Sequence, residues 1–189
     1  GGEVVVAAKK DVVFSGKSSI EKTISTKKFN LLPKLTGANS DGKMSFKSSN
    51  KKVVTVSKKG VVTIKGFGKA KITVTTSATD TYKKGSKKIN ITIIPDKVKG
   101  FKVTSPYKEL VVCEWKADKK VKSCRIEFAT DKAFKNARQY DVNMKKKKYQ
   151  VEMGGLQGKK CYVRISSFVT VNGKAYYSKV SKVISVKVK

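Results

Sequence analysis

The side chains best suited to covalent or metal chemistry in this 189-residue chain are three cysteines, Cys113, Cys124 and Cys161. Their spacing matches no zinc-binding pattern, and the chain has no histidine that could complete a metal site. Each cysteine falls at an inward position of an expected strand, where a thiol behaves as a small apolar group. We therefore expect three buried thiols and no metal site.

Acid–base chemistry has few candidates as well. Histidine, the commonest general base, is absent, and the 13 acidic residues are not spaced as a calcium loop or a glycosidase pair. No pairing of a nucleophile with a base can be assembled from the remaining residues. We predict that the protein is not an enzyme and that it uses no cofactor.

The charge is the most unusual property of the sequence. The chain has 44 lysines and arginines against 13 acidic residues, a formal net charge of +31, and only Arg125, Arg138 and Arg164 are arginines. This surplus, spread over both halves, would attract nucleic acids, anionic wall polymers, acidic glycans or anionic membranes. Alternatively, lysine fills the solvent face of each strand and keeps the chain soluble. Base recognition favours arginine with interleaved aromatic rings, so we expect no specific nucleic acid partner.

The densest basic run is formed by Lys145, Lys146, Lys147 and Lys148. These four lysines are the candidate polyanion-binding site, because clustered ammonium groups can neutralise successive phosphates of a polymer. The alternative is that a run of like charge in a loop is only solvated.

The stretch from Ser48 to Val74 has the most regular pattern in the first half. Three short runs rich in β-branched residues, at 53–56, 61–64 and 70–74, are separated by turn residues. This pattern predicts an antiparallel meander of three strands. Gly60 can adopt the positive φ that follows a tight turn between the first two runs.

Particular residues of this stretch also follow a repeat pattern in order and spacing. They are Ser48, Ser49, Asn50, Val53, Thr55, Val56, Gly60, Val62, Thr63, Gly68, Ala70, Ile72 and Thr73. The pattern resembles the bacterial immunoglobulin-like group 2 family. The resemblance implies an immunoglobulin-like β-sandwich in a secreted or cell-surface bacterial protein, where such domains serve adhesion or space other domains and carry no catalytic residues.

Further strands complete the first half. We expect them at 23–25, 29–32, 44–47 and 87–94, with turn chemistry at 36–43. In the last of these strands Ile89, Ile91 and Ile93 share one face. Pro95 follows directly and cannot extend a β-ladder, so we place a domain boundary there.

The second half again shows a succession of strands. We expect a helical turn around Phe134 and a final hairpin turned by Asn172-Gly173, a strong two-residue turn signal. The expected strands are 98–104, 109–116, 123–129, 140–142, 149–151, 160–171 and 175–188.

A second resemblance is carried by residues in this half. They are Trp115, Ile126, Glu127, Phe128, Ala129, Thr130, Asp131, Phe134, Gly155, Leu156, Tyr162, Val163, Arg164, Ile165, Asn172, Gly173, Lys174, Tyr177 and Ser178. Together they resemble a fibronectin type III domain over about residues 97–189, of the kind found in surface proteins of Gram-positive gut bacteria.

The chain departs from that family at one corner. The family has a tyrosine that starts the sixth strand and ties the corner by its hydroxyl. Here strand parity points Cys161 inward and Tyr162 outward. Either Tyr162 still serves in a shifted register, or Cys161 replaces it and the corner bond is lost. Since the second and sixth strands of such a sandwich run parallel across it, a Cys113–Cys161 disulfide is an alternative to free thiols.

These observations predict an all-β protein of two tandem immunoglobulin-like β-sandwiches, with residues 1–95 as the group 2 domain and 96–189 as the fibronectin type III domain. We expect a non-catalytic extracellular module of a larger surface protein, monomeric, at the cell surface or cell wall, that acts as a spacer or adhesion element. The alternative function is binding of an anionic cell-wall polymer or a host glycan or protein. The sequence has no apolar run long enough to span a membrane.

Overall fold

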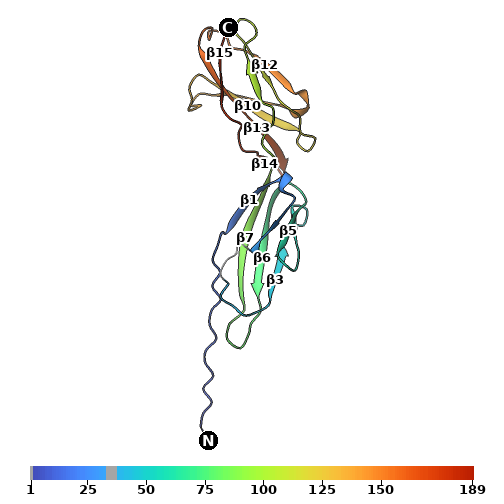
Figure 1. Cartoon of the computed structure of the whole chain (residues 1–189), viewed down its shortest axis with the longest axis vertical. Coiled ribbons are helices and arrows are strands. Elements are labelled where there is room, and N and C mark those ends of the chain that lie inside the picture. The colour runs from blue at the N-terminus through green and yellow to red at the C-terminus, as the bar shows by residue number, and fades with distance from the viewer. Residues whose placement is uncertain (1, 33–37) are drawn as a thin grey trace. The chain divides into compact units, whose positions relative to one another are not determined.

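The structure is a computed structural model that describes residues 2–32 and 38–189 (Figure 1). In these residues the regular elements are strands and short 3₁₀ helices, and contacts divide the chain into two compact units, Gly1–Ile93 and Ile94–Lys189. Each unit is a β-sandwich built from two sheets. The predicted fold class, all-β with two tandem immunoglobulin-like sandwiches, is confirmed.

The first unit packs a four-stranded sheet on a three-stranded one. The four-stranded sheet has the order β1 (Ser19–Thr23), β7 (Gly85–Ile94), β6 (Gly68–Thr76) and β3 (Met44–Ser48). The three-stranded sheet has the order β2 (Lys28–Asn30), β5 (Val61–Ile64) and β4 (Val54–Val56). Between them lies an aliphatic core that includes Ile89, Ile91 and Ile93, all fully buried as strand parity predicted.

The predicted three-stranded meander is wrong in its third strand. β4 and β5 form the expected hairpin, with Val56 opposite Val62 and Gly60 at a φ of 78° in the turn. β6, however, pairs with β3 and β7 in the other sheet. The nine residues of β6 find partners along their whole length on β7, whereas β5 offers only four residues. The longer ladder with β7, in a sheet that covers the other one, therefore decides the partner of β6, although β5 is closer in sequence.

The strand predicted at 23–25 is also partly wrong. β1 ends at Thr23, and Ile24–Thr26 forms a 3₁₀ turn that carries the chain to the other sheet. The hydroxyl of Thr23 bonds those of Ser25 and Thr26, at 3.3 and 3.2 Å, and such local bonds compete with strand pairing. The strand predicted at 29–32 corresponds to β2, which ends at Asn30, and the first part of the predicted 36–43 turn lies outside the described residues.

The second unit has sheets of three and five strands. The smaller sheet has the order β12 (Lys148–Glu152), β9 (Leu110–Glu114) and β8 (Lys102–Thr104). The larger has the order β11 (Arg138–Asn143), β10 (Ser123–Ala129), β13 (Lys160–Val171) and β14 (Lys174–Tyr177), and β15 (Ile184–Lys187) also pairs with β13. The 3₁₀ turn η3 (Met144–Lys146) carries the chain from β11 to β12, between the two sheets.

Two predicted turns of this unit have different outcomes. Asn172 and Gly173, at φ values of 50° and 78°, turn the β13–β14 hairpin as predicted. The helical turn expected around Phe134 is not formed, since residues 131–137 make only turns and Phe134 itself has a φ of 55°. Burial of the Phe134 ring explains this conformation, because only 8% of the residue remains exposed.

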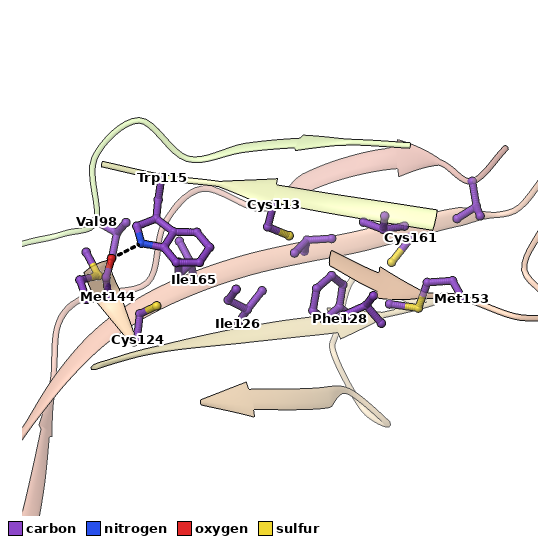
Figure 2. Close-up of a cluster of buried hydrophobic side chains, with 14 residues drawn as sticks. Val98, Cys113, Trp115, Cys124, Ile126, Phe128, Met144, Met153, Cys161 and Ile165 are labelled. Carbon is purple, nitrogen blue, oxygen red and sulfur yellow. Dashed lines mark hydrogen bonds between the residues drawn. The ribbon is translucent and has the colours of Figure 1, made fainter. Parts of the chain in front are cut away.

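The core of the second unit differs from that of the first in its chemistry. Trp115, Phe128 and two methionines join the aliphatic side chains, and all three cysteines lie among them (Figure 2). The indole Nε1–H of Trp115 donates a hydrogen bond of 2.9 Å to the carbonyl oxygen of Met144 (Figure 2). Trp115, a core residue that directly follows β9, therefore holds the η3 turn, in which the lysine run begins.

Candidate functional site: a lysine rim on the second unit

The three cysteines are free and buried, as the sequence predicts. Burial raises the pKa of Cys113 to about 12, and the nearby Cys161 and Cys124 act in the same direction. Burial likewise raises the pKa of Cys124 to about 12, and it raises that of Cys161. A thiol that stays protonated at neutral pH is a poor nucleophile and a poor metal ligand, so these residues act as packing groups.

The corner that departs from the fibronectin pattern is resolved in favour of Cys161. Its side chain is 1% exposed inside the core, while Tyr162 is half-buried on the opposite face of β13. Tyr162 lies opposite Ala129 and Ser185 on the neighbouring strands. The small thiol thus occupies the inward place at which the family has its tyrosine.

The four predicted site lysines lie together in a fixed turn. Lys145 and Lys146 are in η3, Lys147 follows it, and Lys148 begins β12, all four exposed. Asn143 caps the turn by accepting a hydrogen bond of 2.9 Å from the Lys145 amide. Lys147 has a φ of 60°, and its carbonyl accepts a hydrogen bond of 3.0 Å from the Trp115 amide. The run is therefore anchored to the core.

Other lysines are brought to the same place from two distant segments. The Lys116 amide donates to the carbonyl of Lys99 at 2.9 Å, and the Met144 amide donates to that of Lys122 at 2.9 Å. These bonds join the chain before β8, the loop after β9 and the η3 turn. Sequence reasoning missed this juxtaposition, although the basic loop that follows Trp115 was a signal for it.

A groove of about 380 Å³ lies among these segments. Val98, Ala117 and Met144 form its apolar lining. The other lining residues are charged, namely Lys97, Lys99, Lys116, Lys119 and Lys120 with Asp96 and Asp118. We call the lysines of the groove and of the adjoining turn the lysine rim. It consists of Lys97, Lys99, Lys116, Lys119, Lys120, Lys145, Lys146 and Lys147, all exposed.

In the described part of the chain, no rim lysine forms a salt bridge. The carboxylate of Asp118 accepts a hydrogen bond of 2.9 Å from the Lys120 amide and so serves the loop. Five of these lysines line the groove and three extend from the adjoining turn, a cluster of positive charge of the kind that can raise the local concentration of anions.

Two of the three arginines, Arg125 and Arg164, show the opposite arrangement, on the outer face of the larger sheet. Arg125 makes two hydrogen bonds with Asp141, at 2.8 and 3.1 Å, and its guanidinium lies 5.0 Å from the centre of the Tyr177 ring. The hydrogen bonds that Arg125 donates to Asp141 raise the pKa of Arg125. Arg164 likewise forms a two-point bond with Glu127, at 2.6 and 3.3 Å, and lies over Phe134. These charges are already satisfied within the protein.

The described residues hold neither a metal-binding cluster nor a membrane-spanning helix. Among residues 2–32 and 38–189, no group of three or more cysteine, aspartate or glutamate side chains is placed to hold a metal ion. Within the same residues, no helix has the length and apolar character needed to cross a bilayer.

The arrangement of both units is of the immunoglobulin-like class, and one family model agrees with this for the first. A model described as the intimin immunoglobulin-like domain matches residues 33–79. No curated protein matches the chain.

Solved structures with a similar fold contain fibronectin type III domains. A two-domain segment of chicken tenascin is 14% identical over 68% of this chain and 71% of that chain, with a TM-score of 0.47. The FN5 domain of Drosophila Lar is 17% identical over 50% of this chain and 97% of that chain, with a TM-score of 0.39. The fn3 domain of human contactin 1 is 16% identical over 49% and 77% of the two chains, with a TM-score of 0.37.

Proposed function

We propose that this chain is a non-catalytic extracellular module of a larger surface protein, and that it acts as a structural spacer or adhesion element. The observation that carries the proposal is the match of residues 33–79 to the intimin immunoglobulin-like domain, in a unit that is a complete two-sheet sandwich. The burial of all three thiols supports a structural role for the most reactive side chains.

Within this proposal the first domain, residues 1–95, is a group 2 bacterial immunoglobulin-like domain. The second, residues 96–189, is a fibronectin type III domain. The motif residues quoted above support both assignments, and the source is a Gram-positive bacterium that displays the chain as a monomer on its surface. The boundary at Pro95 follows from a proline placed directly after β7.

Surface display is tested by labelling intact cells of the source organism with antibodies raised against the purified chain. We expect labelling of whole cells that is lost after a brief protease treatment of their surface. Labelling that appears only after the cells are lysed would contradict an extracellular location. A cytoplasmic protein probed in parallel controls for leaky cells.

A second candidate function is the binding of an anionic wall polymer or a host glycan. It is favoured by the lysine rim, whose ammonium groups have no carboxylate partner in the described part of the chain. Co-sedimentation with Gram-positive cell walls, intact or stripped of teichoic acid, tests it. Binding at physiological salt that disappears on stripping is the expected result. Binding that is lost as soon as salt is raised would leave the spacer role alone.

A further inference from the structure

The groove of the lysine rim combines exposed lysines with an apolar lining. We propose that it binds a linear phosphodiester polymer, whose phosphates pair with the rim lysines while its uncharged carbon units lie on the apolar lining. This inference rests on the second candidate function above. It goes beyond that function by naming one groove and one ligand chemistry.

The segments that surround the groove are held in place by hydrogen bonds. Three segments, around Lys97, Lys116 and Lys145, are held around the groove by main-chain bonds and by the Trp115 side chain. Lys116 is held further, because its aliphatic stem packs on Gly100, where an added Cβ would come within 2.9 Å of the Lys116 Cγ. The main chain that carries the rim lysines is therefore fixed before a ligand binds, so binding does not have to order these segments.

The groove and the adjoining turn carry an excess of positive charge. The rim has eight lysines, and the carboxylates of Asp96 and Asp118 are the acidic groups that line the groove. Five lysines against two carboxylates leave a net charge of +3 on the lining of the groove, and Lys145 to Lys147 add positive charge from the adjoining turn. The rim lysines form no salt bridge among the described residues, so a bound anion would not have to displace an internal partner.

The types of residue at the groove favour one class of anion. The rim contains lysine only, and lysine binds phosphate as a point charge without the planar fork that arginine presents to carboxylates. Of the described residues that line the groove, none is aromatic, so the site lacks the platforms on which nucleobases stack. Repeated phosphates joined by flexible, uncharged units fit both properties. Nucleic acids and rigid acidic glycans fit them less well.

The experiment titrates the whole chain with synthetic poly(glycerol phosphate) of uniform length and follows binding by calorimetry over a range of salt concentrations. The rim variant changes Lys119, Lys120, Lys145 and Lys146 to glutamine. A matched control changes the same number of exposed lysines on the first unit, namely Lys58, Lys59, Lys69 and Lys71. Both variants lose the same net charge, and the thermal unfolding of each is compared with that of the wild type.

We expect the rim variant alone to lose affinity. Removing four phosphate contacts should make the negative slope of log K against log salt less steep by roughly 3. This corresponds to a loss of affinity on the order of 100-fold near 0.15 M salt. The control should keep the wild-type slope. A single-stranded DNA oligomer and a heparin fragment of equal charge should bind more weakly than poly(glycerol phosphate).

The failures are distinguishable. Equal weakening in both variants would overturn the groove while leaving general polyanion binding in place. Wild-type protein that binds intact cell walls but not poly(glycerol phosphate) would overturn the choice of ligand, as would stronger binding of the DNA or heparin. Binding to neither walls nor polymer at physiological salt would overturn this inference together with the second candidate function, and the spacer role would be unaffected.

Discussion

The second unit uses its two kinds of basic residue in opposite ways. On the outer face of the larger sheet, Arg125 and Arg164 each make a two-point bond with a carboxylate and lie over an aromatic ring. In the lysine rim, the ammonium groups are exposed and form no salt bridge in the described part of the chain. Arg125 and Arg164 thus have their charge paired within the sheet, whereas the charge of the rim lysines faces solvent.

This difference follows from the chemistry of the two side chains. The guanidinium is planar, carries a fork of donors that matches a carboxylate, and stacks on aromatic rings. The ammonium group is compact and strongly hydrated, so a long lysine side chain gains little from an exposed pair. A chain with a net charge of +31 and only three arginines therefore has most of its charge in the form that stays available to an external anion.

The largest expected effect comes from the residue that links the rim to the core. Replacing Trp115 with alanine should destabilise the second unit by about 3–5 kcal/mol, because it leaves a cavity beneath Met144. It also removes the indole donor that holds η3, so the rim should become mobile. Urea unfolding followed by circular dichroism measures the first effect, and amide exchange of Lys145 to Lys147 measures the second.

A milder variant separates packing from hydrogen bonding at this position. Trp115→Phe keeps an aromatic ring but loses the Nε1–H bond to Met144. Faster amide exchange in the η3 turn with modest destabilisation is the expected result. If exchange there were unchanged in both variants, the rim would not depend on the core.

The next effect concerns the arginine face. Glu127 is the more buried partner of its pair, with 13% of its side chain exposed, and it also accepts a hydrogen bond from Gln139. Replacing Glu127 with alanine should cost about 1.5–3 kcal/mol, the range for hydrogen bonds that involve charged groups. A double-mutant cycle with Arg164→Ala measures the part that belongs to the pair. A coupling energy near zero would contradict the role given to arginine here.

Much of this fold could be predicted from local sequence because the signals were local. Strand parity placed Ile89, Ile91 and Ile93 in one core and Cys113 and Trp115 in the other. The partner of β6 could not be predicted in this way, since pairing with β7 depends on how two sheets cover each other and not on neighbouring residues.

The candidate site was visible only in part for the same reason. Lys145 to Lys147 belong to a run of four consecutive lysines, so their charge density could be seen in the sequence. The remaining rim lysines come from before β8 and after β9, and hydrogen bonds such as that from the Lys116 amide to Lys99 bring them together. No periodic pattern encodes such a meeting, because it depends on the folded positions of three loops.

A smaller effect is expected from exchanging the two basic residues on the arginine face. Arg125→Lys keeps the charge but loses the two-point bond with Asp141 and the contact with the Tyr177 ring. Since the Asp141 side chain is 47% exposed, we expect a loss of only about 0.5–1 kcal/mol. The unfolding free energy at low and high salt measures it. A fully stable lysine variant would show that the choice of arginine at this position is not structural.

The smallest effect on stability is expected for the rim lysines, because they form no salt bridge in the described part of the chain. Changing Lys119, Lys120, Lys145 and Lys146 to glutamine removes four exposed charges that form no salt bridge in the described part of the chain. Surface changes of this kind alter stability by within about 0.5 kcal/mol each, and relief of repulsion between like charges acts in the stabilising direction. The unfolding midpoint at low salt should therefore stay the same or rise. A clear fall would mean that the rim lysines support the fold as the arginines do, and the contrast between the two regions would be lost.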